Sequence, residues 1–235
     1  MHSTDIEYVH DDLRLLGRLV VDADTPGTRP AVLIAHDAAG LGDHPRHTAQ
    51  RLAELGFVAF ALDYYGAGAL LAPEQVGERF GQLVGDADRT RALARAGLEV
   101  LLASGYADPT RVAAIGYCFG GTLSLELARS GADLAAVVGF HSGLATTRPE
   151  DAANITGKVL VCIGADDSII PPEQRAAFEE EMRAAGVDWQ MHLYGGAVHS
   201  FTNPDADGTM PAIRYDERAD TRSWQAMLNL FAEVF

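Results

Sequence analysis

The sequence predicts an α/β fold with a mostly parallel sheet flanked by helices, and three observations lead to this expectation. Short, wholly apolar runs alternate with longer helical patterns, which is typical of parallel strands buried on both faces. Two β-like runs at the start, joined at Asp11-Asp12, precede six further strands, and this count favours an open sheet over a closed barrel. The 235 residues show no repeat and no Pro-, Gly- or Ser-rich linker, so we expect one domain over residues 1–235.

The individual elements follow from apolar runs, helical periodicity and chain breakers. Gly56 ends the first expected helix, and Pro172 stands near the start of a later one, where its missing N–H costs little. The expected strands are residues 7–10, 13–21, 31–35, 58–62, 112–116, 135–140, 158–163 and 189–194. The expected helices are residues 46–55, 73–83, 86–103, 120–129, 172–185 and 220–235.

Composition excludes several classes of function. The chain has 33 acidic and 18 basic residues and a formal charge of −15, so we expect neither nucleic acid nor an anionic membrane as a partner. Residues 1–10 lack the apolar core of a signal peptide, and no apolar run reaches membrane-spanning length. Two cysteines are too few for a disulfide framework. A cytoplasmic protein that acts on small molecules is therefore expected.

A candidate nucleophile follows the strand expected at 112–116. The chain reads Gly116-Tyr117-Cys118-Phe119-Gly120-Gly121, and a sharp strand-to-helix turn of this kind needs small residues two positions either side of its central residue. The N-terminus of the following helix favours a thiolate. The alternative is that Cys118 is a small buried residue in a tight turn. Cys162 lies inside an apolar run, and we expect it to serve core packing.

A thiol nucleophile needs a histidine base, and that base needs an orienting carboxylate. Of the eight histidines, His199 alone lies in a glycine-rich loop after a late strand. Asp166 and Asp167 follow the strand before it, and we favour Asp167 as the orienting acid. The predicted catalytic residues are therefore Cys118, Asp167 and His199.

Metal and cofactor chemistry find no support in the motifs. His44 and His47 with Asp43 lack an evident third protein ligand, and we interpret them as solvated polar residues. The chain has neither a dinucleotide-binding fingerprint nor a phosphate-binding loop. We expect no cofactor and no metal.

These segments resemble the dienelactone hydrolase family of α/β-hydrolases. The likeness rests on Gly116–Gly121, on Gly164, Asp167 and Pro171, and on Ala197–Phe201, and it runs from about Ala31 to the final helix. It implies an eight-stranded sheet without a large cap domain, no cofactor, and Cys118, Asp167 and His199 as nucleophile, orienting acid and base. The segment 34–40 resembles the oxyanion loop of the family, which implies that the amides of Ala38 and Phe119 hold the oxyanion.

The chain departs from the family at two positions. Asp37 stands where the family has a glutamate that contacts the resting cysteine, and a contact with Cys118 and a loop-capping role both remain open. Asn203 stands where members that cleave dienelactone have an arginine that binds the substrate carboxylate. For a second arginine that binds the substrate carboxylate, Arg79 is only a loose candidate.

We therefore expect hydrolysis of esters or lactones through a covalent Cys118 intermediate, with neutral activated esters favoured. Neutral phosphotriesters are an alternative substrate class for the same residues. Two readings from other classes are a redox-active thiol at Cys118 and a non-catalytic binding module. The sequence leaves open which aromatic residues line the pocket; the candidates are Tyr64, Tyr65, Phe80, Phe140 and His141.

Overall fold

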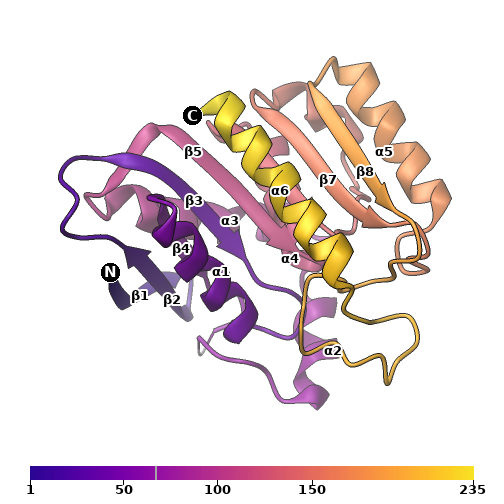
Figure 1. The fold of residues 1–235 in the computed structure, drawn as a ribbon, viewed down its shortest axis with the longest axis horizontal. Helices are drawn as coiled ribbons and strands as arrows, with labels where there is room; N and C mark the ends of the chain where they lie inside the picture. The colour runs from indigo at the N-terminus through magenta and orange to yellow at the C-terminus, as the bar shows by residue number, and fades with distance from the viewer. Residues whose placement is uncertain (67) are drawn as a thin grey trace.

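One mixed sheet of eight strands runs through the computed structural model, which describes residues 1–66 and 68–235 (Figure 1). The strands lie in the order β1-β2-β4-β3-β5-β6-β7-β8. The pairs β1–β2 and β2–β4 are antiparallel, and the other neighbours are parallel. The strands are β1 (His2–His10), β2 (Leu13–Val21), β3 (Arg29–Ala35), β4 (Val58–Leu62), β5 (Ala107–Tyr117), β6 (Ala136–Phe140), β7 (Lys158–Gly164) and β8 (Trp189–Tyr194). The predicted open, mostly parallel sheet of the α/β-hydrolase fold is confirmed.

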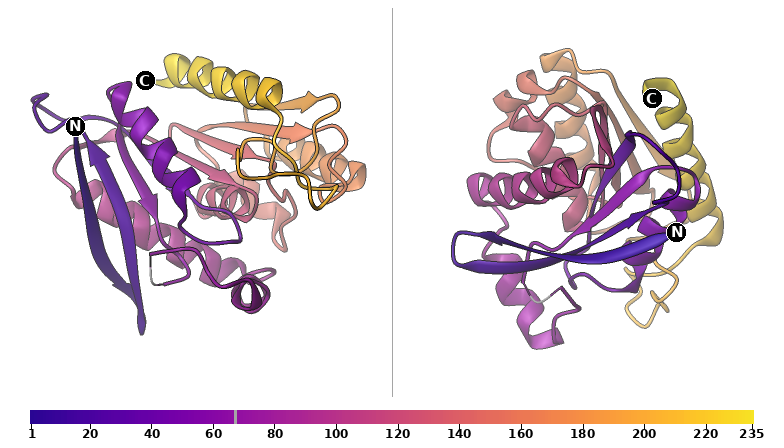
Figure 2. Two further views of the ribbon diagram at one scale, coloured as in Figure 1. Left: turned by 60° about the horizontal axis from the view of Figure 1, so that its bottom comes forward. Right: turned by 90° about the vertical axis from the view of Figure 1, so that its left-hand side faces the viewer.

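Helices cover both faces of this sheet. They are α1 (Asp43–Glu54), α2 (Pro73–Gly81), α3 (Ala87–Ala103), α4 (Phe119–Arg129), α5 (Pro172–Ala185) and α6 (Glu217–Val234), with a short 3-10 helix, η1 (Pro149–Asn154). Helices α1 and α6 lie on one face, and α3 and α4 lie on the other (Figure 1). The hairpin of β1 and β2 forms one edge of the molecule, and β8 with α5 lies at the opposite edge (Figure 2).

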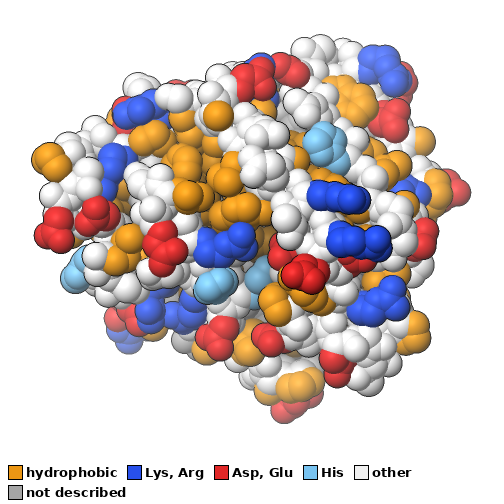
Figure 3. Space-filling model, viewed as in Figure 1, with side chains coloured by type: hydrophobic (Ala, Val, Ile, Leu, Met, Phe, Trp, Pro, Cys, Tyr) orange, Lys and Arg blue, Asp and Glu red, His pale blue; other side chains and the backbone are white. Residues whose placement is uncertain are grey.

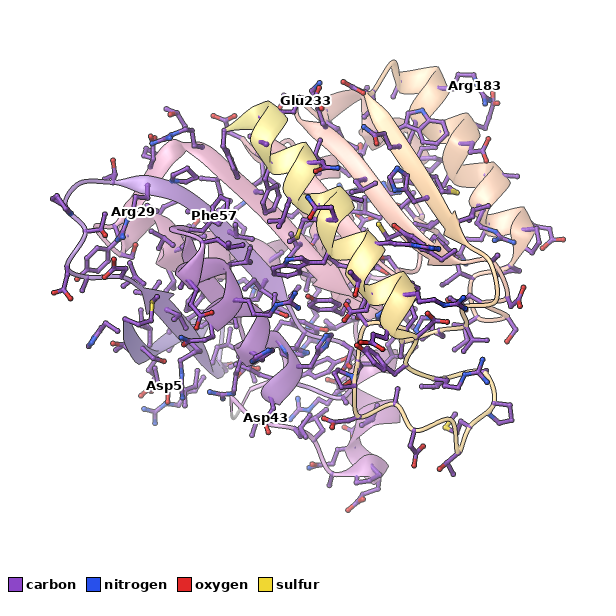
Figure 4. All side chains as sticks on the ribbon, in the orientation of Figure 1. Asp5, Arg29, Asp43, Phe57, Arg183 and Glu233 are labelled. Atoms are coloured by element: carbon purple, nitrogen blue, oxygen red, sulfur yellow. The ribbon has the colours of Figure 1, made fainter. Side chains whose placement is uncertain are left out.

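Two apolar layers result, because successive strand residues point to opposite faces. In β3, Leu33 belongs to the layer beneath α3 and α4, whereas Ile34 belongs to the layer beneath α1 and α6. The face that carries α1 and α6 also shows apolar side chains between the two helices (Figure 3). There Phe57, labelled in Figure 4, packs edge-on against Phe231 with ring centroids 5.5 Å apart.

The structure corrects several expected boundaries. β1 begins at His2, well before the expected position 7. Its first four residues are polar and exposed, so no apolar pattern predicts a strand there. They are held in the strand by pairing with β2 as far as Val21. β5 begins at Ala107, earlier than the expected position 112. Helix α6 begins at Glu217, before the expected position 220, because the Asp216 carboxylate caps its first turn by accepting bonds from the backbone N–H groups of Arg218 and Ala219, both at 3.0 Å. The short helix η1 was not expected.

Among the residues that the structure describes, no helix is long and apolar enough to span a membrane.

Candidate active site

The candidate catalytic residues come from loops at the carboxyl ends of strands, the edge where open α/β sheets place their chemistry. Residues 36–38 follow β3, Cys118 follows β5, Asp167 follows β7 and His199 follows β8. β3, β5, β6, β7 and β8 are successive neighbours in the sheet, so loops that are distant in the sequence meet at this edge.

Cys118 stands at a strained turn between β5 and α4. Its backbone has φ 53° and ψ −121°, a conformation that a non-glycine residue adopts only when its surroundings impose it. The Cys118 N–H donates to the Phe140 carbonyl at 3.0 Å, which ties the turn to the end of β6. The side chain is half-buried at the start of α4.

Two glycines make this turn sterically feasible. A Cβ atom at Gly116 would lie 2.1 Å from the Gly120 carbonyl oxygen, and one at Gly120 would lie 2.1 Å from the His36 carbonyl oxygen. The backbones of the turn and of the loop after β3 are therefore in direct contact. The G-x-C-x-G pattern reflects this close approach of backbones.

We expect Gly120→Ala to lower the free energy of unfolding by more than about 2 kcal/mol, because the added methyl meets backbone atoms that cannot rotate away. Urea unfolding of the two proteins measures the difference. The matched control is Gly77→Ala in α2, where a Cβ meets nothing within 4 Å, and this change is expected to be neutral or to stabilise by up to about 1 kcal/mol. Equal midpoints for the parent and Gly120→Ala would contradict the steric argument.

Asp167 and His199 form a hydrogen-bonded pair. Nδ1 of His199 lies 2.8 Å from Oδ2 of Asp167, and both side chains are buried. The second carboxylate oxygen, Oδ1, accepts the backbone N–H groups of Ile169 at 2.9 Å and Ile170 at 3.1 Å. Three hydrogen bonds thus fix the orientation of the carboxylate, and Asp167 rather than Asp166 contacts the histidine.

The protonated form of His199 is stabilised by its neighbours. Burial by itself lowers the pKa of His199, but the Asp167 carboxylate and the Cys118 sulfur outweigh burial and raise this pKa to about 10. Nε2 of His199 is buried and makes no hydrogen bond of good geometry with any described residue. The Cys118 sulfur lies close enough to raise the pKa of His199, and Nε2 is left available for a reacting group.

The loop after β3 places Asp37 and Ala38 beside the turn. Oδ1 of Asp37 accepts the Ala39 N–H at 2.8 Å, so the carboxylate caps its own loop. Burial raises the pKa of Asp37, and the Ala39 N–H and the charge of His199 oppose this shift. The backbone N–H groups of Ala38 and Phe119 donate to no acceptor within the described residues. They are free donors on the two loops that meet at Cys118.

Two of the aromatic residues that the sequence left open, His141 and Tyr65, are buried near the site. His141 follows β6 with φ 42° and packs its ring edge-on against His199, with centroids 5.0 Å apart. Its Nε2 lies 2.9 Å from Oγ1 of Thr202, on the same loop as His199. The Tyr65 hydroxyl is buried and unpaired among the described residues, and burial followed by the charges of Cys118 and Asp37 raises its pKa. The only sequence signal for either is its place just after a strand.

Two other residues considered from the sequence, His44 and Cys162, pack against other side chains of the protein. His44 packs against the ring of Tyr117, with centroids 4.2 Å apart. No three His, Cys, Asp or Glu side chains of the described residues are arranged to hold a metal ion. Cys162 is buried in β7, where burial raises the pKa of its thiol to about 12. It belongs to the apolar layer beneath α1 and α6, whereas Cys118 packs against the opposite layer.

A pocket of about 390 Å³ opens beside Cys118 and His199. Of the aromatic candidates, Phe80 lines it, while Tyr64 and Phe140 are buried in the core. No lysine or arginine is among the described residues that line the pocket, and Arg79 is not one of them. The lining residues are Phe80, Leu83, Val84, Gly85, Asp86, Ala87, Thr90, Cys118, Phe119, Thr122, Glu126, Gly143, Ala145, Thr146, Thr147, Ile169, Ile170, Gln174 and His199.

A mostly parallel sheet whose central strand ends in a strained strand-to-helix turn, with an acid and a histidine after later strands, defines an α/β-hydrolase. The model of the dienelactone hydrolase family matches residues 16–235. The chain belongs to this family, as the sequence motifs predicted, and is a hydrolase that acts on ester bonds.

Individual relatives agree with this assignment. The chain is 27% identical over 210 residues to a putative carboxymethylenebutenolidase of Aquifex aeolicus, covering 86% of this chain and 87% of the relative. Among solved structures, it is similar to the protein m3DLH, with 47% identity and a TM-score of 0.96 over 100% of this chain and 98% of the other. It is also similar to P91, a dienelactone hydrolase-like promiscuous phosphotriesterase from metagenomic libraries, with 42% identity, a TM-score of 0.96 and the same coverage.

Proposed function

We propose that the protein hydrolyses neutral, activated carboxylic esters or lactones through a thioester at Cys118. The observation that carries the proposal is that Cys118 and His199 line one pocket, with the imidazole held by Asp167 at 2.8 Å and its Nε2 unpaired among the described residues. These are the parts that nucleophilic acyl transfer requires.

The first half-reaction forms the thioester. The Cys118 thiolate attacks the carbonyl carbon, and the N–H groups of Ala38 and Phe119 hold the oxygen that gains the negative charge. The bond from carbon to the leaving oxygen then breaks, and that oxygen takes the proton from Nε2 of His199. Asp37 stays in its loop-capping role, which holds the Ala38 amide in place.

The second half-reaction releases the acid. Nε2 of His199, now neutral, takes a proton from a water molecule as that water attacks the thioester carbon. The carbon–sulfur bond breaks, and the thiolate and the imidazolium re-form beside Asp167. Each turnover consumes one water and needs no redox partner or metal.

The charge of the site favours neutral substrates. Asn203 offers no positive charge, and no lysine or arginine is among the described residues that line the pocket. We expect kcat/KM for phenyl acetate, a neutral aryl ester, to exceed that for dienelactone, a carboxylate-bearing lactone, when both are measured side by side. A much higher kcat/KM for dienelactone would refute this preference.

Neutral phosphotriesters are a second candidate class, favoured by the 42% identity to P91 over the whole chain. Attack of the thiolate on phosphorus would expel an aryloxide and leave a sulfur–phosphorus bond that water must cleave. Turnover of paraoxon beyond one equivalent would support this activity. Permanent inactivation after one equivalent would limit the site to carboxylic esters.

The covalent intermediate is the direct test of the mechanism. The protein is mixed with phenyl acetate, quenched in acid within milliseconds and digested, and the peptide that contains Cys118 is weighed by mass spectrometry. We expect one acetyl group on this peptide and none on the peptide that contains Cys162. Turnover with no acyl group at any mixing time, or an acyl group elsewhere, would reject the thioester.

The redox alternative finds less support. Cys118 and Cys162 pack against opposite apolar layers of the sheet, so the second cysteine cannot resolve a sulfenic acid at the first without unfolding. Two results together would support the redox alternative. The parent would have no esterase activity, and its peroxidase activity would be retained in the His199→Ala variant.

A further inference from the structure

The pocket beside Cys118 is elongated along one helix. Cys118, Thr122 and Glu126 line it at four-residue intervals, which places them on one face of α4. At the helical rise this face extends about 12 Å from the sulfur. We call the space above this face the α4 groove.

The walls of the α4 groove are apolar and come from two separate parts of the chain. Phe80, Leu83 and Val84 come from the end of α2 and the turn before α3. Ile169 and Ile170 come from the loop between β7 and α5. Val84 is 52% exposed and Ile169 is 47% exposed. Large apolar side chains exposed at the rim of a pocket are a common mark of an apolar ligand.

Three polar side chains that line the groove are engaged within the protein. The Thr122 hydroxyl donates to the Gly143 carbonyl at 2.8 Å, and the Thr90 hydroxyl donates to the Leu83 carbonyl at 3.2 Å. The Glu126 carboxylate accepts bonds from two arginines, the half-buried Arg91 at 2.8 Å and the buried Arg129 at 3.0 Å. These three side chains have their partners, so along them a substrate meets apolar contact rather than free hydrogen-bonding groups.

The chemistry decides which part of an ester enters the groove. The leaving oxygen must lie next to Nε2 of His199, because that nitrogen supplies its proton in the proposed reaction. His199 and Cys118 lie together at one end of the groove, and Glu126 lies at the other. The substituent that points away from His199 along α4 is therefore the acyl chain.

We propose that the α4 groove is an acyl-chain site and that the preferred substrates are esters of medium-length, unbranched apolar acids, with Val84 and Ile169 as specificity-determining residues. This inference rests on the proposed ester hydrolysis at Cys118. It adds to that proposal the acyl class and the surface that selects it.

The test compares p-nitrophenyl octanoate with p-nitrophenyl acetate, which share a leaving group and differ only in the acyl chain. The measured quantity is the ratio of their kcat/KM values. We expect the parent to favour octanoate by roughly tenfold or more, since each buried methylene contributes several-fold to binding. Val84→Asp and Ile169→Asp, each placing a charge at the rim, are expected to lower this ratio at least fivefold.

The matched control is Leu193→Asp. Leu193 is 53% exposed on β8 and is not a lining residue of the pocket, so the same change there is expected to leave the ratio as in the parent. Melting temperatures of all variants verify that they are folded.

Two outcomes would overturn the acyl-chain site: a parent that prefers acetate, or an octanoate preference unchanged in both rim variants. The proposed function is judged separately, by whether hydrolysis of either ester requires Cys118. Cys118-dependent cleavage of acetate without an octanoate preference rejects the acyl-chain site alone, whereas no Cys118-dependent cleavage of either ester rejects the proposed function as well.

Discussion

Cys118→Ala is expected to lower kcat for phenyl acetate by at least about 10⁴-fold, the scale on which enzymes with catalytic triads lose activity when their nucleophile is removed. Without the sulfur there is no covalent step, and the Ala38 and Phe119 amides have no tetrahedral intermediate to stabilise. Alanine at the turn keeps a side chain of similar bulk at the φ 53° position, so the fold is retained. Steady-state kinetics and circular dichroism on the same samples check both statements.

The second cysteine, Cys162, provides the control for Cys118→Ala. This residue is fully buried in β7, so Cys162→Ala costs packing energy, on the order of 1 kcal/mol, and leaves the turn at Cys118 intact. We expect it to lower the melting temperature slightly and to keep kcat within about twofold of the parent, far from the change expected at the active site. Equal kcat values for the parent and Cys118→Ala would reject Cys118 as the nucleophile.

Asp167→Asn is expected to reduce kcat/KM for phenyl acetate by about 10²- to 10⁴-fold. The carboxylate holds Nδ1 of His199 at 2.8 Å, and an amide in its place can present an N–H to that nitrogen and stabilise the wrong tautomer. Oδ1 can still accept the backbone N–H groups of Ile169 and Ile170, so the loop stays in place. The change therefore isolates the electrostatic role of the carboxylate.

The pH dependence gives the same variant a second readout. His199 must carry a proton to protonate phenolate, so activity falls as the pH rises through the pKa of His199, which is raised to about 10. Asp167 stabilises the imidazolium, so its replacement lowers this pKa and moves the alkaline limb of kcat/KM to lower pH. Rate profiles for phenyl acetate, corrected for hydrolysis by hydroxide, check the direction. An alkaline limb that stays in place would show that Asp167 does not set the charge of His199.

The sequence predicted the sheet well because buried parallel strands leave a strong local signal. The runs that form β4, β6 and β7 are short and apolar or nearly so, and their expected ranges lie within a residue of the structure. β1 and η1 carry no such signal: β1 is an exposed edge strand fixed by pairing with β2, and η1 packs against α4 and α5 through tertiary contacts. Local sequence patterns cannot predict helices or strands that are stabilised by contacts with residues distant in the sequence.

The same distinction between local patterns and distant contacts applies to the candidate active site. Cys118, Asp167 and His199 were proposed from their order along the chain and their places after strands, and the structure brings Asp167 and His199 together. The contact of His141 with His199 and the walls of the pocket could not be proposed from such order. His141 reaches His199 through a backbone with φ 42°, and the walls of the α4 groove are assembled from segments more than 80 residues apart. Such contacts depend on three-dimensional distances that no short motif records.

The placement of the two cysteines on opposite sides of the sheet has a practical consequence. One thiol is half-exposed at the pocket and the other is buried with its pKa raised to about 12, so a slow thiol reagent such as iodoacetamide modifies the folded protein at a single position. The amount of label taken up then counts the competent molecules in a preparation, and pre-incubation with a compound that fills the pocket slows that uptake. Candidate ligands can in this way be ranked by protection before any turnover assay exists for them.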